Sequence, residues 1–246
     1  MRIFRVILYK TFGLKVYLKI VSKLYLRYIN CGFGKDKYSE LHYLKSIIKS
    51  GFVCIDIGAN LGYYSYFLAK HSGQLGKVYA VEPVPLFAEI WKQNLKRYKS
   101  LNLILLPFAL GKTDKTVQMG MPAIDGVVHH GMTKVIENNE TVFEKTFSVE
   151  MKNPDRLLEN IAHIDFIKID VEGFESEVFE NMKETLAKHK PLIQSELSGQ
   201  DNRKKSIETL QSIGYQVFFL NNYELICAND KIIEKYNGDF YFMIDK

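Results

Sequence analysis

The sequence predicts an α/β fold in which a mostly parallel, seven-stranded sheet is covered by helices on both faces. From residue 51 onward, short apolar segments alternate with segments of helical periodicity, which is typical of parallel sheets with helical crossovers. Acidic residues stand at the ends of several of the predicted strands. Ligands of such sheets bind at the carboxyl ends of the strands, so this edge is the predicted binding site.

The strands are short apolar runs bounded by turn residues or charges. We expect them at residues 53–57, 77–82, 102–108, 165–170, 191–196, 215–220 and 239–244. A hairpin near the end of the chain would give the sheet an antiparallel edge.

The helices follow from apolar residues at helical spacing and from stop signals. In the first of them, Leu41, Leu44 and Ile48 share one face, and Gly51 follows as a stop signal. The predicted helices cover residues 39–49, 63–71, 85–98, 154–161, 175–188 and 203–213. Residues 114–150 are expected to be irregular and partly β.

Composition indicates one globular domain with an N-terminal extension. The chain has 246 residues, of which 47% are hydrophobic, enough for a buried core and far from a disordered composition. We expect the extension over residues 1–50 and the domain over residues 51–246. The three cysteines form no CxxC motif and Cys54 lies in an apolar strand, so we expect reduced thiols and a cytoplasmic location.

Residues 1–34 contain seven Lys or Arg residues and no Asp or Glu. Lys15, Lys19, Lys23 and Arg27 recur every four residues and form one stripe on a largely apolar helix. Charges interrupt every apolar run, which argues against a membrane-spanning helix and a signal peptide. Two interpretations remain open. The helix binds the anionic inner face of a membrane, or it packs on the domain or on a second subunit of a homodimer. No nucleic-acid partner is expected, because no basic and aromatic platform recurs elsewhere.

A glycine-rich turn follows the first predicted strand and contains Asp56, Gly58, Asn60 and Gly62. Its glycines allow positive φ angles, and its backbone N–H groups are expected to be unpaired and to face a ligand. The spacing differs from the G-x-G-x-x-G of dinucleotide sites, and an acid at position 56 would repel a pyrophosphate. The acid suits a cationic ligand, such as one that carries an amino group and a sulfonium.

The second and third predicted strands also end in candidate binding residues. Glu82, followed by Pro83, stands where Rossmann-like sheets place an acid that accepts hydrogen bonds from ribose hydroxyls. A solvated strand end is the alternative, but the spacing from the Asp56 turn favours a nucleoside. Phe108 and Ala109 follow the third strand and could border an adenine, the alternative being a plain strand-to-turn junction.

Asp170 and Glu172 flank the end of a buried strand and are the main candidates for catalysis. Asp170 could accept a proton from a substrate hydroxyl if burial, or a neighbour such as Glu172 or Glu196, raises its pKa. Glu175 is expected to be a helix N-terminal acid. The carboxylates could also bind Mg²⁺, but no regular ligand spacing supports this, so no metal is expected.

His129 and His130 lie in the irregular segment and could reach over the pocket. His129 is the candidate general base of this pair. The alternative is a pair of surface histidines in a loop.

The order of these motifs resembles that of the FkbM-type S-adenosylmethionine-dependent methyltransferases. The resemblance covers about residues 50–220. It rests on DIGANLGYYS (56–65), VEP (81–83), PFALG (107–111), NPDRLLE (153–159), IKIDVEGFE (167–175) and the strand that ends in Glu196. It implies a class I methyltransferase Rossmann-like fold with S-adenosyl-L-methionine as the cofactor.

By position, the resemblance implies a role for each candidate residue. Gly58, Asn60 and Gly62 would line the methionine and ribose part of the cofactor, with Asp56 near its amino group. Glu82, beside Pro83, would hold the ribose hydroxyls, Phe108 and Ala109 would border the adenine, and Asp170 and Glu172 would face the methyl group. The chain departs from the family pattern at Asn153-Pro154-Asp155 and at the histidine pair, which bears on the substrate.

The resemblance implies O-methylation of a hydroxyl, and together with the basic helix it suggests a sugar in a glycan, a glycolipid or a related natural product. The partner would then be a small-molecule or glycan acceptor. Two other function classes stay open. One is an NAD- or nucleotide-sugar-binding oxidoreductase or epimerase on a similar sheet. The other is a non-catalytic nucleoside-binding module.

Overall fold

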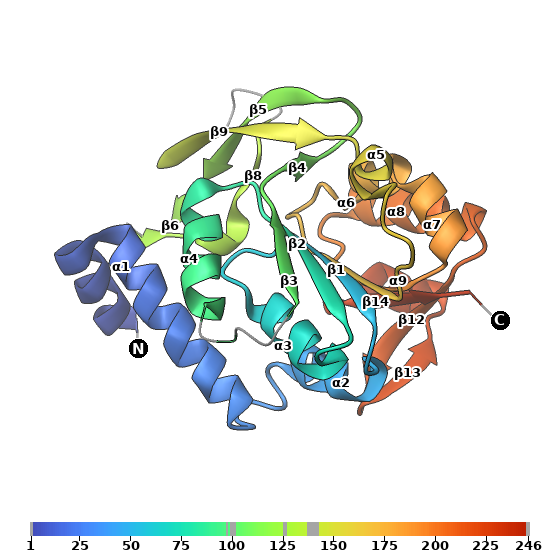
Figure 1. The fold of residues 1–246 in the computed structure, drawn as a ribbon, viewed down its shortest axis with the longest axis horizontal. Coiled ribbons are helices and arrows are strands. Elements are labelled where there is room, and N and C mark those ends of the chain that lie inside the picture. Colours follow the sequence, from blue (N-terminus) through green and yellow to red (C-terminus); the bar gives the residue numbers. More distant parts are fainter. Residues whose placement is uncertain (1, 97, 99–101, 125–126, 137–142, 245–246) are drawn as a thin grey trace.

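The computed structural model describes residues 2–96, 98, 102–124, 127–136 and 143–244. Its centre is a sheet with the strand order β13-β12-β14-β11-β10-β1-β2-β3 (Figure 1). The strands from β11 to β3 pair in parallel, whereas β14, β12 and β13 form an antiparallel edge. The expected mostly parallel sheet with an antiparallel edge is therefore confirmed.

All seven predicted strands are present, within two residues at each end. The parallel strands are β1 (Val53–Ile57), β2 (Lys77–Val81), β3 (Leu103–Leu106), β10 (Phe166–Ile169) and β11 (Leu192–Ser195). The antiparallel strands are β12 (Gln216–Asn221), β13 (Glu224–Cys227) and β14 (Phe240–Met243).

The sheet has eight strands rather than seven, because β12 turns back into β13. Asn222 and Tyr223, between these strands, both have positive φ angles, of 49° and 62°. Two such residues in a two-residue loop are the backbone of a type I′ hairpin. The strand was missed because the usual Asn-Gly or Asp-Gly signature is absent.

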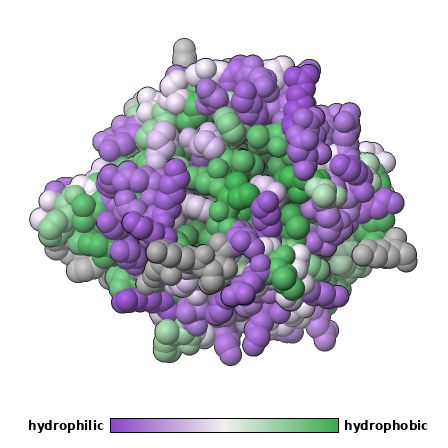
Figure 2. Space-filling view, viewed as in Figure 1, coloured by the Kyte–Doolittle hydropathy of each residue, from purple (hydrophilic) through white to green (hydrophobic). Residues whose placement is uncertain are grey.

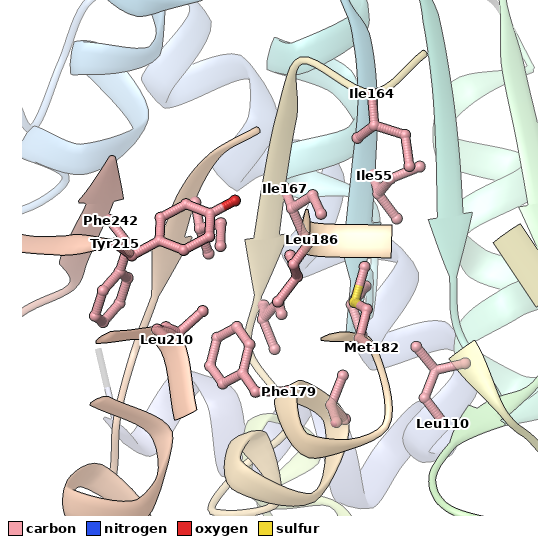
Figure 3. Packing of buried hydrophobic residues seen from close by; sticks show 14 of the residues in the cluster. Ile55, Leu110, Ile164, Ile167, Phe179, Met182, Leu186, Leu210, Tyr215 and Phe242 are labelled. Carbon is pink, nitrogen blue, oxygen red and sulfur yellow. The ribbon is translucent and has the colours of Figure 1, made fainter. Parts of the chain in front are cut away.

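One face of the sheet carries Ile55, Ile167 and Ile193, which form a large hydrophobic core with four helices (Figure 3). These helices are α5 (Pro154–Leu158), α6 (Glu175–Glu180), α7 (Lys183–His189) and α8 (Gln200–Ser212). Phe179 of α6, Leu186 of α7 and Leu210 of α8 are fully buried against the strands.

The opposite face carries Cys54, Val78 and Phe166, because side chains alternate along each strand. It is covered by α2 (Ser39–Ile47), α3 (Tyr63–Ser72) and α4 (Pro85–Leu95). Helices thus cover both faces, as predicted. On β1 and β10 the same alternation places Asp56 and Lys168 on this second face, where they are direct neighbours in the sheet.

Two helices differ from the prediction in more than their bounds. The helix expected over residues 175–188 is divided into α6 and α7. Its division lies at Asn181, whose side-chain amide donates to the Glu177 carbonyl at 2.8 Å and so competes with the helical backbone pattern. A short helix, α9 (Asp230–Lys235), was not predicted, and the Asn229 side chain caps it by accepting from the Ile232 N–H at 3.0 Å.

A second sheet forms from the segment that was expected to be irregular and partly β. Its strand order is β4 (Ala109–Leu110), β9 (Lys145–Lys152), β5 (Lys115–Met121) and β8 (Lys134–Val135). The same segment contains a separate two-stranded sheet of β6 (Ala123–Ile124) and β7 (Val127–Val128) and the 3-10 turn His130–Met132. Residues 125–126 and 137–142 of this segment lie outside the described residues. In Figure 1 the second sheet lies beyond the carboxyl end of β3.

The predicted N-terminal helix is present as α1 (Arg2–Asn30), interrupted at Gly13, which has a φ angle of 73°. Leu14 and Leu18 pack with Phe87 and Ile90 in one hydrophobic cluster, so α1 lies against α4. Leu26 and Ile29 join the cluster of α2 and α3. Among the described residues, no helix is both long and apolar enough to cross a bilayer.

Candidate active site

A cavity of about 300 Å³ lies between the carboxyl ends of β1, β2 and β10 and the second sheet. Figure 2 shows hydrophobic residues framed by hydrophilic ones in the centre of this face, where Figure 1 places the strand ends. The sequence-predicted residues that line the cavity are Asp56, Gly58, Asn60, Glu82, Pro83, Phe108, Ala109, Asp170 and Glu172. The fold therefore brings together residues that lie up to 116 positions apart in the chain.

The glycine-rich turn depends on Gly58 for its close contact with β10. Gly58 has a φ angle of 81°, and a Cβ atom there would overlap the Asp170 carbonyl oxygen. The N–H groups of Gly58 and Ala59 both donate to the Val81 carbonyl at 3.0 Å, and that of Gly62 donates to Ala59. The expectation of unpaired N–H groups is wrong for these positions, because the turn uses them to fix its own shape.

Gly62 is a packing residue of this turn. It is buried at the start of α3 with a φ angle of 89°, and an added Cβ would lie 2.9 Å from Cδ1 of Trp91 on α4. It is absent from the residues that line the cavity. Asn60 does line the cavity, and its buried side-chain oxygen has no hydrogen-bond partner among the described residues. This oxygen could accept a hydrogen bond from a ligand.

Glu82 is buried, with both carboxylate oxygens bonded to the backbone. One oxygen accepts from the Asn60 N–H and the other from the Val84 N–H, each at 2.8 Å. The alternative of a solvated strand end is therefore wrong. Burial raises the pKa of Glu82 to about 7, although the two backbone N–H groups lower it and Asp56 raises it further. Each carboxylate oxygen keeps a lone pair for a hydroxyl donor in the cavity.

Two consecutive side-chain hydrogen bonds, from residues of α3 and α4, hold Asp56 in place. The Ser65 hydroxyl donates to its carboxylate, and the Trp91 indole N–H donates to the Ser65 oxygen at 2.8 Å. Burial raises the pKa of Asp56 to about 6, while the hydrogen bond from Ser65 and the charge of Lys168 lower it. Asp56 is therefore a fixed acid in the lining of the cavity, and it takes up a proton at a higher pH than an exposed aspartate does.

Lys168 is a site residue to which the sequence analysis gave no role. It is 2% exposed, lines the cavity, and forms an ion pair with Asp239 at 2.9 Å. The Gln194 amide donates to the same carboxylate oxygen at 2.6 Å, and the Tyr64 ring lies 5.0 Å from the Lys168 ammonium. Burial alone would lower the pKa of Lys168, but Asp239 and Asp170 raise it, so Lys168 stays charged. A lysine within the apolar strand Phe166–Ile169 was the signal that could have identified it.

Asp170 and Glu172 lie at the end of β10 and line the same cavity. Burial raises the pKa of Asp170, Lys168 lowers it, and Asp239 raises it. Asp239 is therefore an acid that raises this pKa, as burial also does. Burial and the nearby Asp170 and Glu196 raise the pKa of Glu172 to about 8. Glu172 also has a positive φ angle of 54°, uncommon outside glycine.

Glu175 has a structural role at the first turn of α6, as predicted. Its carboxylate accepts the N–H groups of Val171 and Gly173 at 2.9 and 3.1 Å and the Asn202 amide at 2.6 Å. These bonds hold the loop that carries Glu172. Among the described residues, no group of three or more His, Cys, Asp or Glu side chains could hold a metal ion.

The two histidines differ in position. His129 is exposed and is not a lining residue, whereas His130 lines the cavity with its ring 6.1 Å from that of Phe87. The prediction of His129 as a catalytic base is therefore not supported by its position. Several aromatic residues that the sequence analysis did not assign also line the cavity, among them Tyr25 of α1, Tyr63 and Tyr64 of α3, and Phe174.

Comparison with known proteins gives the family of the chain. The profile of the methyltransferase FkbM domain matches residues 56–223. A protein-L-isoaspartate O-methyltransferase from Methanothrix thermoacetophila is 30% identical over 70 residues, which are 28% of this chain and 33% of that protein. The chain therefore matches only about a third of the length of this relative.

Two solved structures show the same fold at low identity. The methyltransferase FkbM from Methylobacillus flagellatus KT is 13% identical, with a TM-score of 0.51 over 82% of this chain and 50% of the other. A putative rRNA-methylase from Clostridium thermocellum is 11% identical, with a TM-score of 0.51 over 85% of this chain and 95% of the other. The predicted class I methyltransferase-like fold is confirmed by these similarities.

Proposed function

Because the chain belongs to the methyltransferase FkbM domain family, we propose that it transfers the methyl group of S-adenosylmethionine to a hydroxyl of a sugar. The sugar would be part of a glycan, a glycolipid or a related natural product. One observation carries this proposal. The cavity that holds the Glu82 carboxylate, suited to ribose hydroxyls, also holds Asp170 and Glu172, which are suited to accept a proton.

The residues of the cavity fit the cofactor S-adenosylmethionine. The free lone pairs of Glu82 suit the two ribose hydroxyls, and the unpartnered oxygen of Asn60 suits a further donor. Asp56 supplies negative charge for an amino group. Phe108 and Ala109 provide an aromatic and a small apolar surface for the adenine. S-adenosylmethionine supplies the methyl group on a positively charged sulfur.

Asp170 and Glu172 provide the base for the reaction. A hydroxyl is a weak nucleophile, so its proton must leave as the new bond to carbon forms. A carboxylate with a pKa of about 8 is a stronger proton acceptor than an ordinary glutamate, and near neutral pH a fraction of it is ionised. The buried ammonium of Lys168 favours ionisation of both acids. The site must also hold the acceptor oxygen and the methyl carbon of the cofactor about 3–3.5 Å apart.

A sugar acceptor is supported by the chemistry of the cavity beside these acids. Tyr25, Tyr63 and Tyr64 line the cavity together with Glu172. Aromatic rings pack on the C–H faces of sugar rings, and carboxylates accept hydrogen bonds from sugar hydroxyls. A site with both features selects a polyhydroxylated, partly apolar molecule better than it selects a flat aromatic amine.

The test is a transfer assay with S-adenosylmethionine labelled on its methyl group and a panel of nucleotide sugars and extracted lipid-linked glycans. We expect label in a sugar methyl ether, identified by mass spectrometry. The Asp170→Asn variant should bind the cofactor and lose transfer. Isothermal titration with S-adenosylmethionine, S-adenosylhomocysteine and NAD tests the cofactor separately. A folded protein that binds NAD and no S-adenosylmethionine would support an oxidoreductase instead. If the protein binds S-adenosylmethionine but the label appears only on nitrogen or in protein, the sugar hydroxyl is refuted as the acceptor and the cofactor assignment stands.

A further inference from the structure

The outward face of α1 is apolar as well as basic. Val16, Lys23, Leu24 and Arg27 are spaced so that they share one side of the helix after Gly13, and all four are exposed. Leu24 is 55% exposed. Phe12, just before the interruption, is 57% exposed.

The packing of α1 does not require these residues. Leu14, Leu18 and Leu26 are at most 5% exposed and already join α1 to the hydrophobic clusters of the domain. Ser22 and Asn94 fix the same contact by a hydrogen bond of 2.9 Å from the Asn94 amide to the Ser22 oxygen. The outward residues are therefore available for another surface.

The charge of this face has one sign. Residues 1–34 contain no Asp or Glu. Lys15 forms an ion pair with Glu89 of α4 at 2.7 Å, whereas Lys23 and Arg27 form no ion pair with any described residue. Unpaired cations beside exposed leucine and valine are typical of helices that lie in the interface of an anionic membrane.

We propose that the outward face of α1, defined by Val16, Lys23, Leu24 and Arg27, binds the surface of a membrane that contains anionic lipids. A second copy of the chain fits less well. A two-fold contact through this face would oppose identical cations, with no acid of α1 to balance them. An anionic lipid surface balances the cations and accepts the apolar side chains together. This inference concerns a partner and does not depend on the acceptor of the methyl group.

The binding assay uses the full chain, because removal of residues 1–34 would uncover the apolar surface under Leu18 and Leu26. Vesicles of phosphatidylcholine alone are compared with vesicles that also contain phosphatidylglycerol, by co-sedimentation. We expect binding to the anionic vesicles only, and weaker binding as NaCl is added. Each lysine or arginine near an anionic surface strengthens binding about fivefold. The variant Lys23→Gln/Leu24→Ser/Arg27→Gln should therefore bind at least about twenty-five-fold less, because it loses two cations and an apolar side chain.

A matched variant on other surfaces controls for charge and hydropathy. Lys204→Gln/Leu75→Ser/Lys205→Gln also removes two cations and one exposed leucine, with Leu75 84% exposed. It should bind the vesicles like the unchanged protein, and all three proteins should share one melting temperature. Equal loss in both variants would overturn the proposal, as would equal binding to neutral vesicles. Self-association that only the α1 variant abolishes, without vesicle binding, would identify a second copy as the partner.

Discussion

At the scale of single residues, Glu82 has two roles in the site. Its carboxylate fixes the glycine-rich turn through the Asn60 N–H and the start of α4 through the Val84 N–H. Glu82 also lines the cavity, where ribose hydroxyls would bind. A ligand at Glu82 would therefore bind to a group that the protein has already oriented, which reduces the entropic cost of binding.

We expect Glu82→Ala to weaken S-adenosylmethionine binding by roughly tenfold to a thousandfold. Hydrogen bonds to a charged group contribute about 1.5–3 kcal/mol each, and the variant loses those to the ligand as well as the anchors of the turn. Isothermal titration measures the affinity. Glu82→Gln keeps the size of the side chain and should give an intermediate loss, because its NH₂ group must face one backbone N–H. Unchanged affinity in both variants would show that Glu82 does not contact the ligand.

The acids of the cavity were predictable from the sequence, whereas the ion pair between Lys168 and Asp239 was not. Asp170 and Glu172 are adjacent to a strand end, and this position is visible in the sequence. Lys168 depends on Asp239, which is 71 residues away and reaches it only through the neighbouring strands β11 and β14. The Lys168–Asp239 ion pair depends on the order of the strands in the sheet, and a local sequence pattern does not contain that order.

A double-mutant cycle measures the Lys168–Asp239 pair. Lys168→Met alone leaves the Asp239 carboxylate buried without its cation and should destabilise the protein by about 3–5 kcal/mol. Lys168→Met/Asp239→Asn removes both charges and should recover a large part of this loss. Urea unfolding gives the free energies of unfolding. Strictly additive effects of the two substitutions would contradict a direct coupling.

At the scale of elements, the apolar strands were predictable, and the turns that join them were less so. Strands such as β1 and β10 are apolar runs with clear ends, and their bounds agree with the prediction. The hairpin at Asn222 and the helix break at Asn181 depend on single side chains and φ angles that periodicity does not report. The paired N–H groups of the glycine-rich turn follow from the neighbouring strand β2, which supplies the Val81 carbonyl.

The turn between β1 and α3 can be tested with a pair of glycine variants. Gly58→Ala should destabilise the protein and abolish cofactor binding, because its Cβ would overlap the Asp170 carbonyl and separate β1 from β10. Gly214→Ala is the control, since Gly214 also has a positive φ angle, of 100°, but open space around its Cβ position. It should lose only about 1 kcal/mol, from backbone strain, and keep its affinity. Thermal unfolding and titration report both effects, and equal losses would refute the proposed overlap.

At the scale of the whole molecule, the raised carboxyl pKa values predict how stability depends on pH. The ordinary pKa of a glutamate is near 4.5, whereas burial raises that of Glu82 to about 7 and that of Glu172 to about 8. At these two carboxyls the folded protein holds more protons than the unfolded chain between about pH 4.5 and pH 8, so their contribution to stability falls as pH rises through this range. His71, whose pKa burial lowers to about 4, has the opposite effect below about pH 6.5.

The melting temperature of the ligand-free protein should therefore decrease between about pH 6.5 and pH 8. Glu172→Gln removes one of the groups that titrate there and should make this decrease smaller. Differential scanning calorimetry at several pH values measures it. A melting temperature that increases with pH over this range would show that these carboxyls are ionised at lower pH than their burial implies.

The overall architecture was predictable because alternation of strands and helices restricts the topology strongly. The position of α1 was less predictable, since its broad apolar pattern allowed packing on the domain or binding elsewhere. The structure uses one side for packing on α4 and leaves Leu24 and Val16 outside. The second sheet was also underestimated, because part of its pairing joins β4 to β9 over a large sequence separation.

Leu24 and Tyr25 are consecutive residues of α1, and Leu24 is exposed to solvent whereas Tyr25 lines the cavity. One helix therefore contributes to both the cavity and the surface proposed to bind a membrane. If contact with a surface at Leu24 changes the affinity for a ligand beside Tyr25 by some factor, then that ligand changes the affinity for the surface by the same factor. A cofactor-loaded chain and an empty chain would then partition differently between membrane and solution.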